Sequence, residues 1–274
     1  ARGRTLLALG IAHAFHSRPD DLARADPAFD EAASLFRVLG EQRWEADAMN
    51  RLAVMVSYHG GRISLAADQQ AASLALLPAG SAEWAVGMTY YAEMLDYLGR
   101  SVESEAAARE AWEVGQRLGD SRVSAYGAWT GAVVAAHRHD REAVDRWLAE
   151  TEGNAGPWLE EVTGQEFLAF AADILCGLGE EERSRVYRDR VAARVGNAGT
   201  RELLDVLDGR LEAMFGDATR GVELFDRLDG EPYATIRTKW VRHLFRAVAA
   251  KRLGDRPTAT RHVQLCLDLV EQMG

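Results

Sequence analysis

Residues Trp84–Asp120, WAVGMTYYAEMLDYLGRSVESEAAAREAWEVGQRLGD, predict two helices joined by a tight turn. Apolar residues recur at steps of three and four in both halves, which is the spacing of helices that bury one face. Gly99 ends the first helix, because glycine adopts the left-handed conformation that a helix end requires. The second helix begins near Ser101 and ends at Gly119. Since a lone helical hairpin cannot cover its apolar face, the stretch predicts neighbouring hairpins of the same kind.

Helix-ending residues recur along the whole chain in two interleaved ladders. Turns inside hairpins are expected near Asp20, Gly60, Gly99, His139-Asp140, Gly179, Gly216 and Gly254. Turns between hairpins are expected at Gly40, Gly80, Gly119, Gly156, Gly199 and Gly230. Both ladders step by about 40 residues, which is the period of helical repeat arrays. Two ladders that share one period indicate a repeat protein.

The sequence therefore predicts an all-α fold, a right-handed α-solenoid of about seven helical hairpins in one domain, residues 1–274. The helices are expected at Arg4–Phe15 and from Asp26-Pro27 to Gly40, then Trp44–Tyr58, Ile63–Leu77, Trp84–Leu98, Ser101–Gly119, Ser121–Ala136, Arg141–Glu150, Trp158–Leu178, Glu181–Val195, Arg201–Phe215, Ala218–Leu228, Tyr233–Leu253 and Pro257–Met273. Because both ends of the chain directly adjoin predicted helices, we expect a fragment of a longer protein.

Composition excludes several classes of protein. The formal net charge is −10, whereas nucleic-acid surfaces are rich in Lys and Arg, so we expect no direct nucleic-acid contact. No apolar run is long enough for a membrane span, and no signal peptide is visible. The two cysteines, Cys176 and Cys266, lie far apart inside helical patterns. We therefore expect free, buried thiols in a cytoplasmic protein.

Small residues lie where two helices of a hairpin would cross closely. They are Gly10, Ala53, Ala92 and Gly131 on first helices, and Ala143, followed by Trp147, on a second helix. With the phrases LFRVLGEQRWEADAMNRLA and AWEVGQRLGDSRVSAYGAW, they resemble tetratricopeptide repeats, in particular the degenerate repeats of large actinobacterial LuxR-type and related ATP-dependent transcription regulators. Gly221 departs from this pattern, because a packing alanine is expected there.

The resemblance implies a role for the repeats as a sensor or interaction surface. In such regulators a nucleotide-binding domain precedes the repeats, and a DNA-binding helix-turn-helix domain lies elsewhere in the chain. Similar degenerate repeats also occur in adaptors and chaperone-binding proteins. The resemblance therefore favours a regulator and leaves a general scaffold as the alternative.

Motifs that carry chemistry are missing from the sequence. It contains no phosphate loop, dinucleotide fingerprint, zinc-binding pattern or nucleophile elbow, so we expect no cofactor, no metal and no catalysis. The histidines at positions 13, 16, 137 and 139 are interpreted as helix-surface residues. The acidic residues Glu160, Glu161 and Glu180–Glu182 are similarly interpreted as charges near helix ends.

A groove is expected on the concave side of the stack, which the first helix of each hairpin would line. Registering these helices on their small residues predicts a polar, aromatic and mostly acidic set: Asp47, Asn50, Tyr58, Thr89, Glu93, Asp96, Tyr97, Trp129, Glu166, Asp173 and Arg210. Such a groove suits a basic or extended peptide, or a small polar ligand flanked by the aromatic side chains. The alternative is an ordinary solvated helix surface.

Three functions remain open at this point. The leading hypothesis is a non-catalytic module of a bacterial transcriptional regulator, which binds a protein or peptide partner or a small polar effector. The second is a general scaffold that binds peptide segments of partner proteins and has no role in transcription. The third is an enzyme with an unrecognised site in the groove. Because the terminal hairpins lack a polar cap, the sequence also predicts a homodimer.

Overall fold

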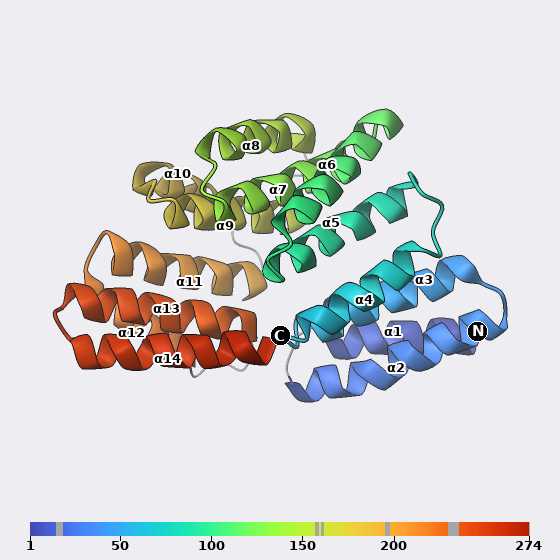
Figure 1. Cartoon of the computed structure of the whole chain (residues 1–274), viewed down its shortest axis with the longest axis horizontal. Coiled ribbons are helices and arrows are strands. Elements are labelled where there is room, and N and C mark those ends of the chain that lie inside the picture. Colours follow the sequence, from blue (N-terminus) through green and yellow to red (C-terminus); the bar gives the residue numbers. More distant parts are fainter. Residues whose placement is uncertain (15–18, 157–158, 160–161, 195–197, 230–235, 274) are drawn as a thin grey trace. The chain divides into compact units, whose positions relative to one another are not determined.

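The computed structural model describes residues 1–14, 19–156, 159, 162–194, 198–229 and 236–273. Over these ranges the backbone forms fourteen α-helices, one of which continues into a π-helical segment, and no β-strand (Figure 1). The all-α class and the succession of helical hairpins are therefore confirmed. The right-handed sense of the solenoid and its single-domain organisation stay predictions.

The contacts within the chain define two compact units, one that includes Ala1–Val134 and one that covers Ala135–Glu271. The first contains α1 (Arg2–Ala14), α2 (Pro19–Val38), α3 (Gln42–Arg51), the π segment η1 (Leu52–Tyr58), α4 (Ile63–Leu74), α5 (Ala82–Tyr97), α6 (Ser101–Leu118) and most of α7 (Ser121–His137). The second contains α8 (Arg141–Ala155), α9 (Val162–Gly177), α10 (Glu181–Ala192), α11 (Ala198–Met214), α12 (Ala218–Asp229), α13 (Ile236–Arg252) and α14 (Arg256–Met273).

Most of the helices end at a residue in the left-handed backbone conformation, as the two series of predicted turns indicate. Positive φ angles between 65° and 81° occur at Gly40, Gly61, Gly80, Gly99, Gly119, Gly179 and Gly254, and His139 has φ 56°. The turn expected at Gly60 therefore has its left-handed residue one position later, at Gly61. Gly199 lies instead in the first turn of α11. Gly230 and the helix ends expected at Phe15, Trp158, Val195 and Tyr233 lie outside the described residues.

The helix expected to begin at Asp26-Pro27 begins earlier, and this prediction is wrong. Helix α2 runs from Pro19 to Val38 and contains Pro27 in its interior. Pro19 occupies the first helical position, where a missing N–H costs nothing. Leu22 and Ala25, which precede Pro27, are buried in the core of the first hairpin. This burial offsets the hydrogen bond that the interior proline removes.

Small residues let the paired helices approach closely. A Cβ atom built on Gly10 would lie 2.6 Å from the ring of Phe29, which is fully buried. Burying such a ring contributes about 1.5–3 kcal/mol. At Gly221 a Cβ atom would lie 2.8 Å from the backbone nitrogen of Ala213. The departure from the repeat pattern at Gly221 therefore reflects a backbone approach too close for alanine.

Buried serines repeat the same contact in both units. The Ser104 hydroxyl donates to the carbonyl oxygen of Ala92 at 2.6 Å, and the Ser184 hydroxyl donates to that of Ala172 at 2.7 Å. In each case a second helix bonds to the first helix of its own hairpin. A buried hydrogen bond of this kind contributes about 1 kcal/mol. The two serines are 80 residues apart, which is twice the predicted period.

The helix expected at Trp44–Tyr58 changes its hydrogen bonding halfway. Helix α3 ends at Arg51, and η1 continues it with the wider π pattern. The amide of His59, which follows η1, donates to the carbonyl of Val54 at 3.4 Å. π segments inside helices are rare and often mark functional sites. Here the change of pattern begins directly after residues that line a cavity.

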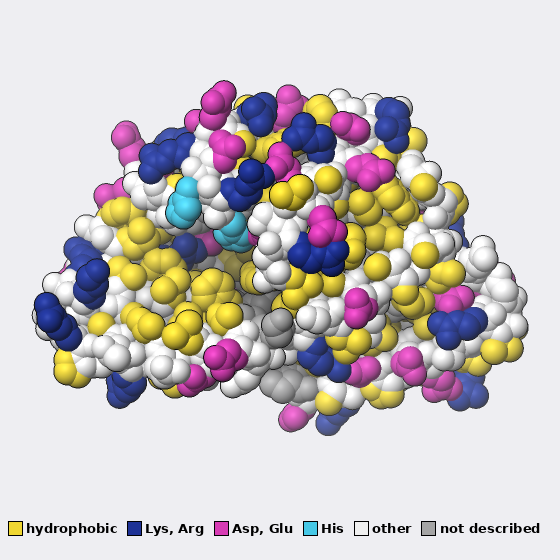
Figure 2. All heavy atoms as spheres, in the orientation of Figure 1, with side chains coloured by type: hydrophobic (Ala, Val, Ile, Leu, Met, Phe, Trp, Pro, Cys, Tyr) yellow, Lys and Arg dark blue, Asp and Glu magenta, His cyan; other side chains and the backbone are white. Residues whose placement is uncertain are grey.

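Charged side chains of both signs are interspersed with apolar ones on the face shown in Figure 2. The formal charge of −10 is thus not gathered into one acidic surface on this face. Many arginines pair with carboxylates of the neighbouring hairpin, as Arg190 does with Glu152 at 2.6 Å. Such exposed pairs each contribute about 0–1 kcal/mol.

Candidate functional site

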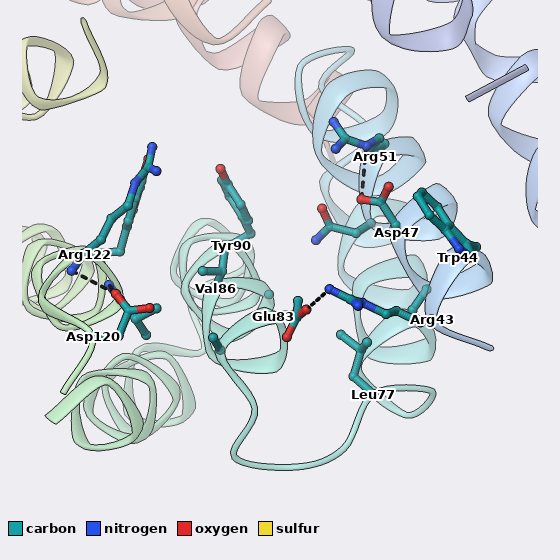
Figure 3. Close-up of a pocket in the computed structure, with 16 residues that line it drawn as sticks. Arg43, Trp44, Asp47, Arg51, Leu77, Glu83, Val86, Tyr90, Asp120 and Arg122 are labelled. Atoms are coloured by element: carbon teal, nitrogen blue, oxygen red, sulfur yellow. Dashed lines mark hydrogen bonds and ion pairs between the residues drawn. The ribbon is translucent and has the colours of Figure 1, made fainter. Parts of the chain in front are cut away.

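A cavity of about 780 Å³ opens in the first unit across the first helices of three consecutive hairpins. Its walls come from α3, α5 and the start of α7, with Leu77 between α4 and α5. The charged and aromatic lining residues are Arg43, Trp44, Asp47, Arg51, Glu83, Tyr90, Asp120, Arg122 and Tyr126 (Figure 3). The cavity lies on first helices, and the prediction that this face of the helices binds a ligand stays a prediction. We refer to the cavity below as the α3/α5/α7 groove.

The acidic side chains of the groove are engaged with neighbouring groups. Glu83 pairs with Arg43 and so links α5 to α3. Asp47 pairs with Arg51 along α3, with 3.1 Å between Oδ1 and Nε. Asp120 Oδ1 accepts hydrogen bonds from the backbone amides that begin α7, at 3.0 and 3.1 Å. The groove is therefore not the mostly acidic surface that the sequence predicts.

Arg122 differs from the other two arginines of the groove. Its side chain is exposed, and among the described residues its guanidinium has no ion-pair partner. Figure 3 shows Arg122 and Tyr90 projecting to the same side from α7 and α5. Tyr126, one turn further along α7, also lines the cavity. A cation beside two aromatic rings favours a ligand with an anionic group and an apolar part.

A buried relay of amides fixes the orientation of Asn50 in the groove wall. Asn50 Nδ2 donates to Gln70 Oε1 at 3.0 Å, and Gln70 Nε2 donates to the carbonyl of Gly87 at 3.1 Å. Gln70 is fully buried, so the relay joins α3, α4 and α5 through the interior. A Cβ atom on Gly87 would lie 3.0 Å from Gln70 Nε2. The relay holds the Asn50 amide in place without any ligand.

The predicted site residues do not form one groove. Asp47 and Asn50 line the cavity. Tyr58, Glu93 and Tyr97 come together elsewhere, where η1 and α5 end. The Tyr58 hydroxyl donates to Glu93 Oε2 at 2.9 Å, and the two tyrosine rings meet edge to face with centroids 5.8 Å apart. Since Tyr58 is buried, this second cluster ties η1 to α5.

Three further predicted residues occupy separate positions in the first unit. Thr89 is buried, and its hydroxyl donates to the carbonyl of Val86 at 2.8 Å. Asp96 is partly buried near the end of α5. Trp129 is partly buried on α7, where its ring lies 6.0 Å from that of Tyr126. None of the three lines the cavity, although Thr89 and Trp129 each contact a residue that does.

The remaining predicted residues, Glu166, Asp173 and Arg210, lie in the second unit. Burial raises the pKa of the Glu166 carboxyl. Arg210 pairs with Asp173, and its guanidinium lies 4.3 Å from the centre of the Phe245 ring. Burial lowers the pKa of Arg210 to about 9, so the guanidinium stays charged at neutral pH. This pair, in which Arg210 is buried and Asp173 is partly exposed, joins α9 to α11.

Most of the residues that line the cavity were not predicted from the sequence. The groove face of α5 was predicted to carry Thr89, Glu93 and Asp96, whereas the cavity is lined by Glu83, Val86 and Tyr90. Ala92 packs against α6, and the groove face lies on the opposite side of α5. A spacing of three and four residues from Glu83 was the signal that could have identified it.

No metal-binding cluster is found in the described part of the chain. Over those ranges no three His, Cys, Asp or Glu side chains could together hold a metal ion. None of the helices in these ranges is both long and apolar enough to span a membrane. Cys176 and Cys266 are free and buried, as predicted. Burial raises the pKa of the Cys176 thiol to about 12. His16, Glu160 and Glu161 lie outside the described residues.

A histidine pair joins the two helices of the last hairpin. The Nδ1 atoms of His243 on α13 and His262 on α14 are 3.1 Å apart, and the rings stack with centroids 5.2 Å apart. One ring must donate and the other accept, so the two imidazoles cannot both be protonated while this contact is made. Burial lowers the pKa of both imidazoles, and the charge of Arg246 lowers it further.

We expect the second unit to lose stability as the pH falls. The folded state binds protons at these histidines less readily than the unfolded chain, so acid favours unfolding. The neutral histidine pair contributes fully to the free energy of unfolding above the ordinary histidine pKa of about 6.5. This contribution is lost progressively as the pH falls below that value. Urea unfolding at pH 7.5 and 5.5 would measure the loss, which His262→Asn should reduce. His139→Asn is the control, because asparagine tolerates a positive φ. An identical pH dependence in both variants would contradict this account.

No protein family matches this chain, and no curated protein matches it either. Among solved structures, it is similar to a tetratricopeptide repeat protein from Parabacteroides merdae, with 12% sequence identity and a TM-score of 0.36. That similarity covers 88% of this chain and 99% of the other. The function of the α3/α5/α7 groove has to be inferred from its own residues.

Proposed function

We propose that this protein is a non-catalytic binding module, and that the α3/α5/α7 groove holds an extended peptide segment of a partner protein. One observation carries the proposal. Arg122 has no ion-pair partner among the described residues, and it lies on the wall of a cavity whose acidic residues are all engaged. The guanidinium of Arg122 is therefore available to an anionic ligand, because no carboxylate that lines the groove pairs with it.

The chemistry of the lining indicates the class of ligand. An arginine guanidinium binds a carboxylate through two parallel hydrogen bonds. Tyr90 and Tyr126 offer rigid apolar area with a polar tip beside it. Asn50, which the relay to Gln70 orients, is an amide that can pair with a peptide group. The groove thus suits a short acidic peptide segment and not the basic peptide expected from the sequence.

A small polar effector with a carboxylate is the second ligand that the groove could accept. The volume of about 780 Å³ falls within the range of small-molecule pockets, about 300–1,000 Å³. The two ligands share the anionic group that Arg122 would bind. A peptide would make further contacts along α3 and α5, whereas a small effector would stay within the cavity.

We also propose that the module belongs to a bacterial transcriptional regulator. The support is the resemblance of its repeat phrases to those of large actinobacterial regulators. In that role, occupation of the groove would report the presence of an effector or partner to the rest of the protein. A general scaffold would bind peptides equally well but would not change the expression of any gene. A reporter assay with and without the groove ligand separates the two roles.

Thermal unfolding with a library of acidic peptides and carboxylate metabolites tests the groove. A ligand that binds only the folded state raises the unfolding midpoint by mass action. For any ligand found, we expect Arg122→Ala to weaken binding about tenfold or more, because a charge-assisted hydrogen bond contributes about 1.5–3 kcal/mol. Isothermal titration calorimetry would measure this change.

Arg109→Ala on α6 is the matched control. Arg109 pairs with Glu105 on the same helix and does not line the groove, so its loss should leave affinity unchanged. Equal affinities for Arg122→Ala and the unaltered protein would place the ligand elsewhere. Binding of basic peptides alone would also contradict the proposal.

A further inference from the structure

The hydrogen bonds behind the groove wall have a fixed direction, which begins at the backbone of α5. The carbonyl oxygen of Gly87 can only accept a hydrogen bond, and Gln70 Nε2 donates to it at 3.1 Å. Gln70 is fully buried, so the opposite orientation of its amide would leave polar groups unsatisfied in the interior. The Gln70 amide is therefore held with its Oε1 atom on the side of α3.

This direction is passed on to Asn50 in the groove wall. Gln70 Oε1 is an acceptor, and Asn50 Nδ2 donates to it at 3.0 Å. The reverse orientation of the Asn50 amide would bring two acceptor oxygens together, so the position of its Oδ1 atom is also determined. Asn50 is partly buried and lines the cavity, and no described residue donates a hydrogen bond to Oδ1. The groove therefore holds one oriented acceptor in addition to the cation of Arg122.

We infer that the groove binds an acidic peptide segment through a backbone N–H group, which donates to Asn50 Oδ1, and through a carboxylate, which pairs with Arg122. The inference rests on the proposed function of the groove, and it decides between the two ligands named there. A carboxylate effector without an N–H group would cover Asn50 Oδ1 without pairing it, and an unpaired buried acceptor weakens binding. Every non-proline residue of a peptide supplies such a donor.

The positions of the two groups favour a ligand that extends across α5. Asn50 belongs to α3 and Arg122 to α7, and both line the cavity. Tyr90 of α5 projects between Arg122 and Arg51 (Figure 3). Arg51 directly follows Asn50 in the sequence. An extended peptide carries an N–H group and an acidic side chain at separate points along its length, and the tyrosine ring between them can pack against an apolar part of it.

Ester replacement in a bound peptide tests for the N–H group, with the whole chain as the protein. The probes are short capped peptides composed of Asp, Glu, Tyr and Ala, and glutarate serves as a carboxylate without an N–H group. In the tightest-binding peptide, each backbone amide is replaced in turn by an ester, which removes the N–H donor and keeps the backbone shape. We expect one of these replacements to raise the dissociation constant about tenfold, and glutarate to bind more weakly than the peptide. Isothermal titration calorimetry measures these affinities.

A variant in α4 shows whether the buried relay sets this preference for the amide. In Gln70→Leu the Asn50 amide can turn, so the amide and ester forms of the peptide should bind within about twofold of each other. Gln69→Leu is the matched control on the same helix. Gln69 Oε1 accepts a hydrogen bond from Ser57 Oγ at 2.7 Å, and Gln69 does not line the groove, so this variant should keep the preference of about tenfold. Circular dichroism checks that both variants fold.

Arg122→Ala separates this inference from the proposed function. A peptide that loses affinity in Arg122→Ala, but whose ester forms all bind as well as the amide, would overturn the inference alone. Glutarate that binds as tightly as the peptide would do the same. An unchanged preference for the amide in Gln70→Leu would show that the relay does not orient Asn50, and it too would overturn the inference. Peptide affinity that stays the same in Arg122→Ala, or the absence of any binding, would overturn the proposed function and the inference with it.

Discussion

Replacing Arg242 with alanine should lower the free energy of unfolding by about 3–5 kcal/mol, the cost of breaking a buried ion pair. Arg242 lies on α13 and is only 1% exposed. It donates to Glu202 Oε1 at 3.0 Å and to the carbonyl of Leu228 at 2.8 Å. Alanine would remove both hydrogen bonds and leave space that the aliphatic part of the arginine fills.

Guanidinium unfolding of the Arg242→Ala variant measures this loss. Arg220→Ala serves as the control, because Arg220 is an exposed arginine 3.9 Å from Glu212. Exposed pairs contribute about 0–1 kcal/mol, so the control should unfold close to the unaltered protein. Similar small losses in both variants would mean that the second unit adapts to the loss of Arg242.

Replacing Gly127 with alanine should destabilise the first unit by about 1–2 kcal/mol. A Cβ atom at this position would lie 2.4 Å from the backbone nitrogen and 2.7 Å from the Cα atom of Trp112. Relief requires a shift of α7 against α6, and overpacking of this kind costs about 1–3 kcal/mol or more. The better helix propensity of alanine returns about 1 kcal/mol. The steric cost is the larger of the two.

Gly153→Ala is the matched control within a helix, and it should raise the free energy of unfolding instead of lowering it. Gly153 lies inside α8, and a Cβ atom there would meet nothing within 4 Å. Only the propensity gain remains, so the variant should be more stable by about 0.5–1 kcal/mol. Urea unfolding of both variants makes the comparison. A neutral or stabilising Gly127→Ala would show that α6 and α7 separate without cost.

The helical hairpins were predictable because their ends depend on local chemistry. A residue such as Gly99 or Gly119 ends a helix through its own φ angle, 73° or 65° here. The ladders therefore located most turns to within a residue. Pro27 was misread because its local signal, a helix start, was overridden by the burial of its neighbours in α2. The division into two units follows from contacts between residues far apart in the sequence, and the repeat period does not predict such contacts.

The groove was less predictable because its properties depend on pairs of distant residues. Asp47 and Asn50 were identified from their place on a first helix. Whether a charge is available to a ligand depends on its partners, however, and Arg43 meets Glu83 from 40 residues away. Arg122 stands out only once such pairs are known. Its place in the groove could not be inferred from its neighbours in sequence.

The π segment η1 sets the angle between two parts of one helix. Asn50 in the groove wall precedes it, and Tyr58, bonded to Glu93, ends it. Deleting one residue from Leu52–Tyr58 would favour a return to the ordinary α pattern and would turn the groove residues about 100° relative to Tyr58. Asn50 could not then bond to Gln70 while Tyr58 still bonds to Glu93. The number of residues in η1 therefore fixes the rotation of the groove residues relative to the Tyr58 cluster. Only a chain that keeps this number can form both sets of contacts at once.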